Sequence, residues 1–147
     1  MRPKTTHIPT VFIVFGATGD LMERKIVPAL YHLFEKDKLS KFFKIIGFSR
    51  QDLSDEQFKE QVFKALTTHK DNTLKTCGLF CEIFSYHKGL FENKADYNSL
   101  VKKLKEIDDS WGICSNKLFY FAVPPQFYKT IFKNLAESGL TIPCSPK

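Results

Sequence analysis

The sequence predicts an α/β protein with an open, doubly wound parallel sheet. Apolar runs of strand length alternate along the chain with amphipathic stretches of helix length, which is the pattern of successive βαβ units. The first apolar run leads directly into a glycine-containing turn, residues 16–19, in front of a predicted helix. With 147 residues and 43% hydrophobic content, the chain is large enough for one such domain and too short for a second.

The first βα unit begins with an uninterrupted apolar strand at Thr10–Phe15. A short turn is expected at Asp20–Lys25, and the main helix is expected to begin near Val27. Pro28 sets this start, because a residue without an N–H fits best in the first turn of a helix.

The second unit has its strand at Lys44–Phe48. The segment from Ser54 to Gln57 has the sequence of a capping box, in which two side chains satisfy backbone N–H groups at the start of a helix. This predicts a helix that extends to about Thr67.

In the third unit, a weaker strand near Cys81–Tyr86 precedes a helix at Asp96–Ile107, whose leucines recur on one face. The fourth unit has a strand at Lys117–Val123 that is expected to be fully buried. A helix then extends from the following Pro-Pro pair to a stop at Gly139. Right-handed crossovers would place a crevice at the carboxyl ends of the first and fourth strands.

The glycine turn at this crevice predicts a site for a dinucleotide. Gly16 and Gly19 allow the backbone to approach a pyrophosphate closely, and the following helix start adds a partial positive charge. The spacing departs from G-x-G-x-x-G, since Thr18 and Leu21 occupy its second and third glycine positions, and no Gly-Lys-Ser/Thr of a P-loop follows. By pattern alone, a tight turn in any α/β domain remains the alternative.

The residues after the second strand favour NADP over NAD. Arg50 can make a forked, charge-assisted pair with a 2′-phosphate, and the Thr18 hydroxyl can assist it. Asp52 keeps NAD as an alternative, because an acidic residue near this point holds the ribose hydroxyl of NAD. Arg50 could also be an ordinary surface arginine.

Composition excludes several other classes. The net charge of +6 comes from lysines spread over several helices, so we rank nucleic-acid binding last. No stretch approaches the roughly twenty apolar residues of a membrane span, and the amino terminus has no secretory pattern, so a cytoplasmic protein is expected. The histidines lack a metal-ligand spacing, and no metal is expected. The cysteines are expected to be reduced thiols: Cys77, Cys81, Cys114 and Cys144.

Four segments then occur in a specific order: Gly16-Ala-Thr-Gly-Asp-Leu21, Arg24-Lys-Ile-Val-Pro-Ala-Leu30, Gly47-Phe-Ser-Arg50 and Leu118-Phe-Tyr-Phe-Ala-Val-Pro-Pro125. Together they resemble the amino-terminal, Rossmann-like domain of the glucose-6-phosphate 1-dehydrogenase family, from about residue 10 to 139. The resemblance implies an enzyme that oxidises C1 of glucose 6-phosphate to 6-phosphogluconolactone and passes hydride to NADP⁺, in the pentose phosphate pathway. It also implies a homo-oligomer for the full-length enzyme, with subunit contacts largely from a later domain.

The resemblance also implies roles for individual residues. Arg50 matches the family's 2′-phosphate arginine, assisted by Thr18, and Lys25 matches a basic residue at the substrate end of the cleft. Pro124 and Pro125 match a pair beside the nicotinamide, and Tyr128 matches a nearby tyrosine. The pyrophosphate turn corresponds to eight consecutive residues: Gly16, Ala17, Thr18, Gly19, Asp20, Leu21, Met22 and Glu23.

Some family features differ or are absent. Met22 stands where alanine is usual, Glu23 stands where a basic residue is usual, and the segment Tyr86–Phe91 matches the family only in its first residues. The E-K-P-F-G segment, the R-I-D-H-Y-L-G-K-E substrate motif and the histidine base are missing, so we assign no catalytic residue.

We therefore expect a single NADP-binding domain over residues 1–147, without the family's α+β substrate domain and without the fifth strand of the sheet. Such a chain is expected to bind cofactor without catalysing the reaction. A free-standing NADP-sensing module is the alternative.

Overall fold

The structure, a computed structural model, describes residues 8–68 and 73–143. Within these residues, four parallel strands form one sheet in the order β3-β2-β1-β4. Their bounds are Thr10–Phe15 (β1), Phe43–Ser49 (β2), Phe84–Lys88 (β3) and Asn116–Phe121 (β4). The chain steps outward from β1 to β3 and returns to the other side of β1 for β4. This topology confirms the predicted doubly wound sheet, with its reversal between β1 and β4.

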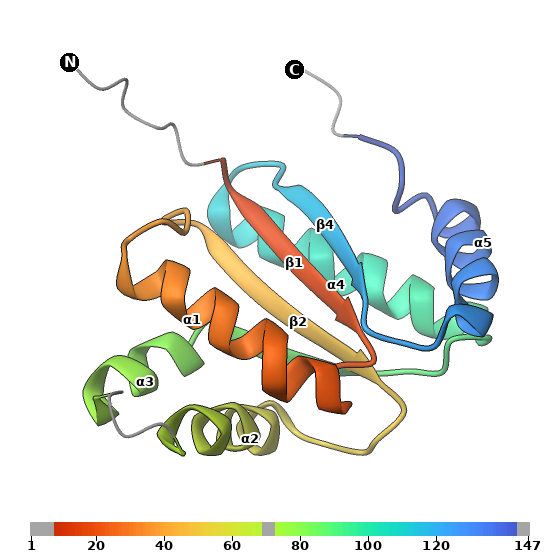
Figure 1. The fold of residues 1–147 in the computed structure, drawn as a ribbon. Helices are drawn as coiled ribbons and strands as arrows, with labels where there is room; N and C mark the ends of the chain where they lie inside the picture. Colours follow the sequence, from red (N-terminus) through yellow and green to blue (C-terminus); the bar gives the residue numbers. More distant parts are fainter. Residues whose placement is uncertain (1–7, 69–72, 144–147) are drawn as a thin grey trace.

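Helices cover both faces of the sheet, with α1 in front and α4 behind in Figure 1. Residues of α1, α2 and α3 form one core with one face of the sheet, and residues of α4 and α5 form a second core with the other face. The helix bounds are Val27–Glu35 (α1), Asp55–Thr67 (α2), Leu74–Cys81 (α3), Lys94–Trp111 (α4) and Tyr128–Ser138 (α5), with short turns at Met22–Ile26 (η1) and Pro125–Phe127 (η2).

The strand register aligns the carboxyl ends of three strands. Phe15 at the end of β1 lies opposite Phe48 on β2 and Phe121 on β4. Its ring packs against these two rings, with centroid distances of 4.9 Å and 5.6 Å. The residues that follow each strand therefore meet at one edge of the sheet.

Two helix boundaries confirm the sequence prediction. At the start of α2, the Ser54 N–H donates to Gln57 Oε1 at 2.9 Å, and the Gln57 N–H donates to Ser54 Oγ at 3.1 Å, which completes the capping box. At the other end of the chain, α5 follows the Pro-Pro pair and is capped by Gly139.

The segment before α1 differs from the short turn predicted at Asp20–Lys25. Helical backbone begins at Asp20 and continues through the π-helical turn η1 into α1, which begins at Val27 as predicted. The Val27 N–H donates to the Met22 carbonyl five residues earlier. The wider turn accommodates Pro28, which lacks an N–H and whose ring would clash with a carbonyl four residues earlier.

The third strand begins later than predicted. The sequence prediction placed it at Cys81–Tyr86, but Cys81 ends α3, a helix that the prediction missed, and β3 begins at Phe84. The Thr73 side chain caps this helix by accepting a hydrogen bond from the Thr76 N–H. Cys77, Phe80 and Cys81 form its buried face at helical spacing, so their apolar character belongs to a helix instead of a strand.

The prediction that Lys117–Val123 is a fully buried strand is wrong. β4 is an edge strand in which exposed and partly buried residues alternate. Leu118 and Tyr120 are 46% and 40% exposed, because α1 covers β1 and β2 on that face and does not extend over β4. Phe119 and Phe121 pack into the core on the opposite face.

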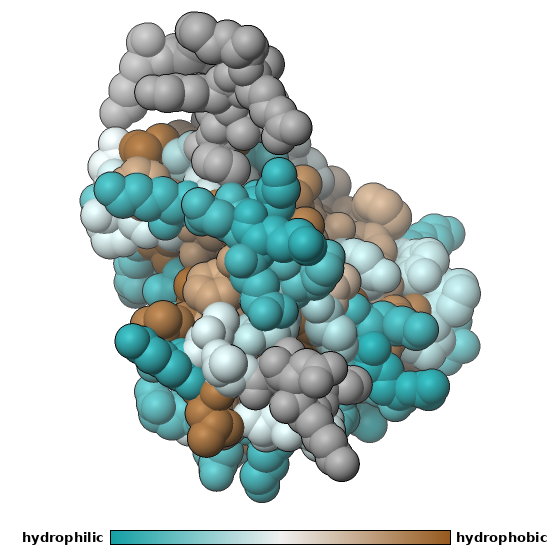
Figure 2. Space-filling view, turned by 60° about the vertical axis from the view of Figure 1, so that its left-hand side comes forward, coloured by the Kyte–Doolittle hydropathy of each residue, from teal (hydrophilic) through white to brown (hydrophobic). Residues whose placement is uncertain are grey.

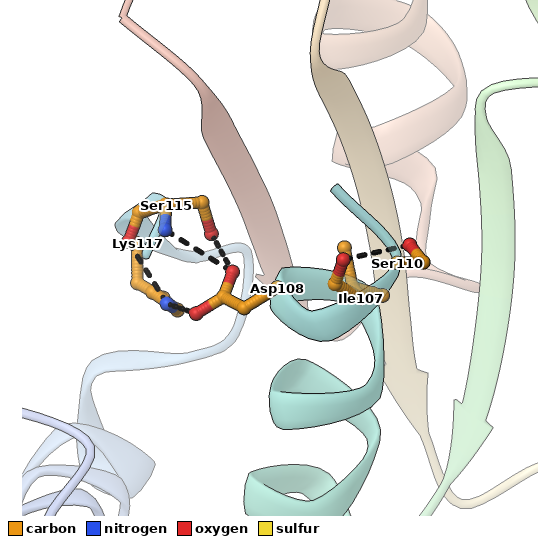
Figure 3. Close-up of polar contacts among 5 residues, drawn as sticks. All are labelled: Ile107, Asp108, Ser110, Ser115 and Lys117. Atoms are coloured by element: carbon orange, nitrogen blue, oxygen red, sulfur yellow. Dashed lines mark hydrogen bonds and ion pairs between the residues drawn. The ribbon is translucent and has the colours of Figure 1, made fainter. Parts of the chain in front are cut away.

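A polar cluster joins the end of α4 to the start of β4 (Figure 3). Asp108 accepts hydrogen bonds from the backbone N–H and the hydroxyl of Ser115 and pairs with the Lys117 ammonium group. Lys117 also donates to the Ser115 carbonyl at 2.8 Å. The side chains of Asp108 and Lys117 are only 16% and 17% exposed, so this ion pair is largely removed from water.

The face of the molecule in Figure 2 is mainly hydrophilic, with hydrophobic side chains in small separate groups. None of the helices within 8–68 and 73–143 is long and apolar enough to cross a membrane. Cys77 and Cys81 are free thiols buried on α3, as predicted. Cys114 is disulfide-bonded, so the prediction of a reduced thiol is wrong there, since sequence spacing does not reveal spatial proximity. Cys144 lies outside the described residues.

Candidate functional site

A cleft of about 360 Å³ opens at the carboxyl edge of the sheet, where the reversal of strand order was predicted to place the ligand. Its walls come from the segments that follow β1, β2, β3 and β4. The lining residues are Gly16, Thr18, Gly19, Ser49, Arg50, Gly89, Leu90, Phe91, Glu92, Ala122, Val123, Pro124 and Phe127.

The glycine turn forms one wall, and its backbone is fixed by neighbouring strands. The Gly16 N–H donates to the Phe48 carbonyl at 2.9 Å, and the Gly19 N–H donates to the Gly16 carbonyl at 3.1 Å. Gly16 has a φ of +84°, and a Cβ atom there would lie 2.4 Å from the Ala122 carbonyl oxygen. Only glycine therefore lets the end of β4 pack directly against the turn.

The end of β2 is attached to the same turn. The hydroxyls of Thr18 and Ser49 share a hydrogen bond of 2.8 Å. The next residue, Arg50, is exposed, and its guanidinium group has no ion-pair or hydrogen-bond partner among the described residues. A free guanidinium group and two hydroxyls on the walls of one cleft are suited to bind a phosphate group.

Asp52, the residue that kept NAD as an alternative, is outside the lining of the cleft. Its carboxylate is 90% exposed and lies 3.9 Å from the Lys88 ammonium group at the end of β3. This ion pair leaves the Asp52 carboxylate oriented toward Lys88.

Residues 89–92 form a further wall of the cleft, which the sequence analysis did not assign to the site because the segment Tyr86–Phe91 matches the family only in its first residues. The Gly89 N–H donates to the Ser49 carbonyl at 2.9 Å, and the Leu90 N–H donates to Asp96 Oδ2 at 2.8 Å. The Phe91 carbonyl accepts hydrogen bonds from the Tyr97 hydroxyl at 2.7 Å and from Asn134 Nδ2 at 2.9 Å. The loop is therefore held by β2, α4 and α5. The available signals were the glycine directly after the third strand and the partial family match of the segment Tyr86–Phe91.

The structure separates the predicted cofactor and substrate residues into three groups. Gly16, Thr18, Gly19, Arg50 and Pro124 line the cleft. A smaller cavity of about 170 Å³ between η1 and α2 is lined by other members of the turn, together with Thr18 and Gly19: Ala17, Met22 and Glu23. The remaining predicted residues line neither space: Asp20, Leu21, Lys25, Pro125 and Tyr128.

Two of these outlying residues have other contacts. Asp20 forms an exposed ion pair with Arg24 at 3.1 Å, and the Tyr128 ring packs against Phe121 at 5.7 Å. The predicted substrate residue Lys25 is exposed on η1. Their proposed roles stay predictions.

Comparison with known proteins identifies the family. Residues 13–145 match the family model described as glucose-6-phosphate dehydrogenase, NAD binding domain. The chain belongs to this family. It is 38% identical over 134 residues to a glucose-6-phosphate 1-dehydrogenase of Chlamydia pneumoniae and 36% identical over 135 residues to that of Leuconostoc mesenteroides. The two alignments cover 90% and 92% of this chain.

A solved structure of a family member has the same fold. It is a glucose-6-phosphate dehydrogenase in complex with glucose 6-phosphate, with a TM-score of 0.81, 32% identity and 90% of this chain covered. The chain spans only 28% of that protein, and 26% and 28% of the two relatives above. It thus corresponds to the dinucleotide-binding domain of an oxidoreductase family, and the predicted resemblance is confirmed.

Proposed function

We propose that this domain binds NADP⁺ in the cleft at the carboxyl edge of the sheet, and that Arg50 selects NADP⁺ over NAD⁺ by pairing with the 2′-phosphate. The Arg50 guanidinium is exposed at the end of β2 and has no partner among the described residues, while the adjacent backbone and the Thr18–Ser49 hydrogen bond are fixed.

The residues present fit a dinucleotide in other respects. Gly16 leaves a surface without a side chain at the start of a helix, where a pyrophosphate is stabilised by backbone N–H groups and the helix dipole. Gly89 and Pro124 add further backbone surface to the walls. When bound, NADP⁺ supplies a hydride acceptor.

We propose further that the domain serves a glucose-6-phosphate 1-dehydrogenase, which oxidises glucose 6-phosphate to 6-phosphogluconolactone. Oxidation at C1 requires a base within hydrogen-bonding distance of the sugar hydroxyl. The ionisable residues among those that line the cleft are Arg50 and Glu92, and neither is the histidine base of the family. In this proposal, the described residues bind and orient the cofactor, and the catalytic base lies elsewhere in a longer protein.

Isothermal titration calorimetry with NADP⁺ and NAD⁺ tests the proposal. The chain should bind NADP⁺ more tightly, and Arg50→Ala should weaken NADP⁺ binding by about tenfold or more, since hydrogen bonds to charged groups contribute roughly 1.5–3 kcal/mol. NAD⁺ binding should change little. Arg24→Ala is the matched control, because it removes the same charge from a residue outside the cleft. Equal affinity for the two cofactors, or an unchanged NADP⁺ affinity in Arg50→Ala, would contradict the proposal.

A further inference from the structure

Tyr86 on β3 is buried and contacts the chain on both sides of Arg50. It is 5% exposed, and its ring packs against Phe58 of α2 with a centroid distance of 5.2 Å. Its hydroxyl lies 3.1 Å from the Ser49 carbonyl oxygen and 2.7 Å from the Gln51 carbonyl oxygen, and it donates its proton to this pair of acceptors. One buried hydroxyl thus bonds to the carbonyl groups of the two residues that flank Arg50.

The backbone before Arg50 is fixed by further bonds. The Ser49 carbonyl also accepts from the Gly89 N–H at 2.9 Å, and the Ser49 hydroxyl is bonded to Thr18 at 2.8 Å. Beyond Ser49, the Gln51 carbonyl is attached to the core through Tyr86. The backbone of Arg50 is therefore held on both sides, while its side chain is exposed to the cleft.

Tyr86 is itself held by helices on both faces of the sheet. Its N–H donates to Asp55 Oδ1 of α2 at 2.7 Å, and its carbonyl accepts from Lys103 Nζ of α4 at 2.7 Å. Burial raises the pKa of Tyr86, so the hydroxyl keeps its proton and remains a donor at neutral pH. The residue is a rigid support for the loop that follows β2.

We infer that Tyr86 is a positioning residue for cofactor selectivity: its hydroxyl fixes the Ser49–Gln51 backbone so that the Arg50 guanidinium is directed toward the 2′-phosphate of NADP⁺. The inference rests on the proposed function of Arg50. A bidentate pair between guanidinium and phosphate demands a narrow range of positions, and a mobile loop would lose conformational entropy on binding. The Tyr86 hydroxyl removes that cost before the cofactor binds.

Tyr86→Phe tests the inference, because it removes the hydroxyl and retains the ring that packs on Phe58. The affinities of the variant for NADP⁺ and NAD⁺ are measured by calorimetry and expressed as a ratio. That ratio does not depend on the folded fraction, since partial unfolding weakens both affinities by the same factor. Tyr31→Phe is the matched control: it removes a buried hydroxyl on α1 that has no hydrogen-bond partner among the described residues.

The expected result is that Tyr86→Phe weakens NADP⁺ binding by about three- to tenfold, the effect of one net hydrogen bond. NAD⁺ binding should remain unchanged, and Tyr31→Phe should change neither. In the Arg50→Ala background, Tyr86→Phe should have no further effect on NADP⁺ affinity, because the hydroxyl acts through Arg50.

Three outcomes would overturn the inference. An equal loss of affinity for both cofactors would indicate a purely structural role, and an unchanged NADP⁺ affinity would show that Arg50 needs no such support. Suppose that the unmodified chain prefers NADP⁺ and that Arg50→Ala loses this preference. Either of these two results then refutes only the role of Tyr86, and the proposed function of Arg50 stands. If the unmodified chain has no preference, both the proposed function and this inference fail.

Discussion

Replacing Gly16 by alanine should destabilise the domain more than the same change at any exposed glycine. The residue has a φ of +84°, which costs an L-residue about 1–2 kcal/mol. The new Cβ would also lie 2.4 Å from the Ala122 oxygen and 2.8 Å from Val123 Cγ1. The Ala122 N–H donates to the Phe15 carbonyl at 2.9 Å, so relief requires β4 to move away from β1.

Overpacking of this kind costs about 1–3 kcal/mol, which brings the expected loss of unfolding free energy for Gly16→Ala to roughly 2–5 kcal/mol. Two other glycines separate the cost of the positive φ from the cost of the collision with β4. Gly112 has a φ of +68° with nothing within 4 Å of its Cβ position, so Gly112→Ala should show the backbone cost alone, about 1–2 kcal/mol. Gly78 lies inside α3 with equally open space, so Gly78→Ala should stabilise by about 0.5–1 kcal/mol.

Urea unfolding followed by far-ultraviolet circular dichroism measures the three free energies. The difference between Gly16→Ala and Gly112→Ala isolates the collision with β4. A Gly16→Ala variant that unfolds within about 0.5 kcal/mol of Gly112→Ala would refute the close packing of the glycine turn against β4.

Two further predictions concern stability. Asp108→Ala should destabilise by roughly 3 kcal/mol, because it leaves the Lys117 ammonium group largely buried without its partner, and a variant combining Asp108→Leu with Lys117→Met should recover most of this loss in the same urea assay. Equal stability of the single and double variants would contradict a buried pair. Burial raises the pKa of Cys81 to about 11 and of Tyr97 to about 12. Both values exceed those of the unfolded chain, so the stability that these groups confer is complete below about pH 8.5 and is lost as pH rises through 11 to 12. Urea midpoints measured from pH 7 to 11 should decline more steeply for the unmodified chain than for Cys81→Ala, and identical slopes would contradict the assignment.

Local sequence signals predicted much of the fold. The capping box at Ser54 and Gln57, the apolar run of β1 and the glycine after α5 depend on neighbours within a few residues, and each is found where it was predicted. The position of Pro28 indicated where α1 begins. It did not indicate that a π-helical turn would precede the helix.

The remaining features depend on contacts between distant segments. The exposure of Leu118 follows from the edge position of β4, which an apolar run does not reveal. The cleft wall at residues 89–92 is held by Asp96, Tyr97 and Asn134 from two helices, and the support of Arg50 comes from Tyr86 two strands away from the glycine turn. No local pattern marks such residues, because their role exists only after the strands are aligned.

If the cleft at the carboxyl edge of the sheet is the NADP⁺ site, the segments that line it should respond to the cofactor in solution. The most direct test is a titration of the ¹⁵N-labelled chain with NADP⁺, followed by amide chemical shifts in NMR spectra. We predict saturable shifts in three segments, 16–19, 49–51 and 89–92, with little change at Asn116 on the opposite edge of the sheet. Shifts concentrated outside these segments, or no saturable shifts at all, would show that NADP⁺ does not bind in this cleft.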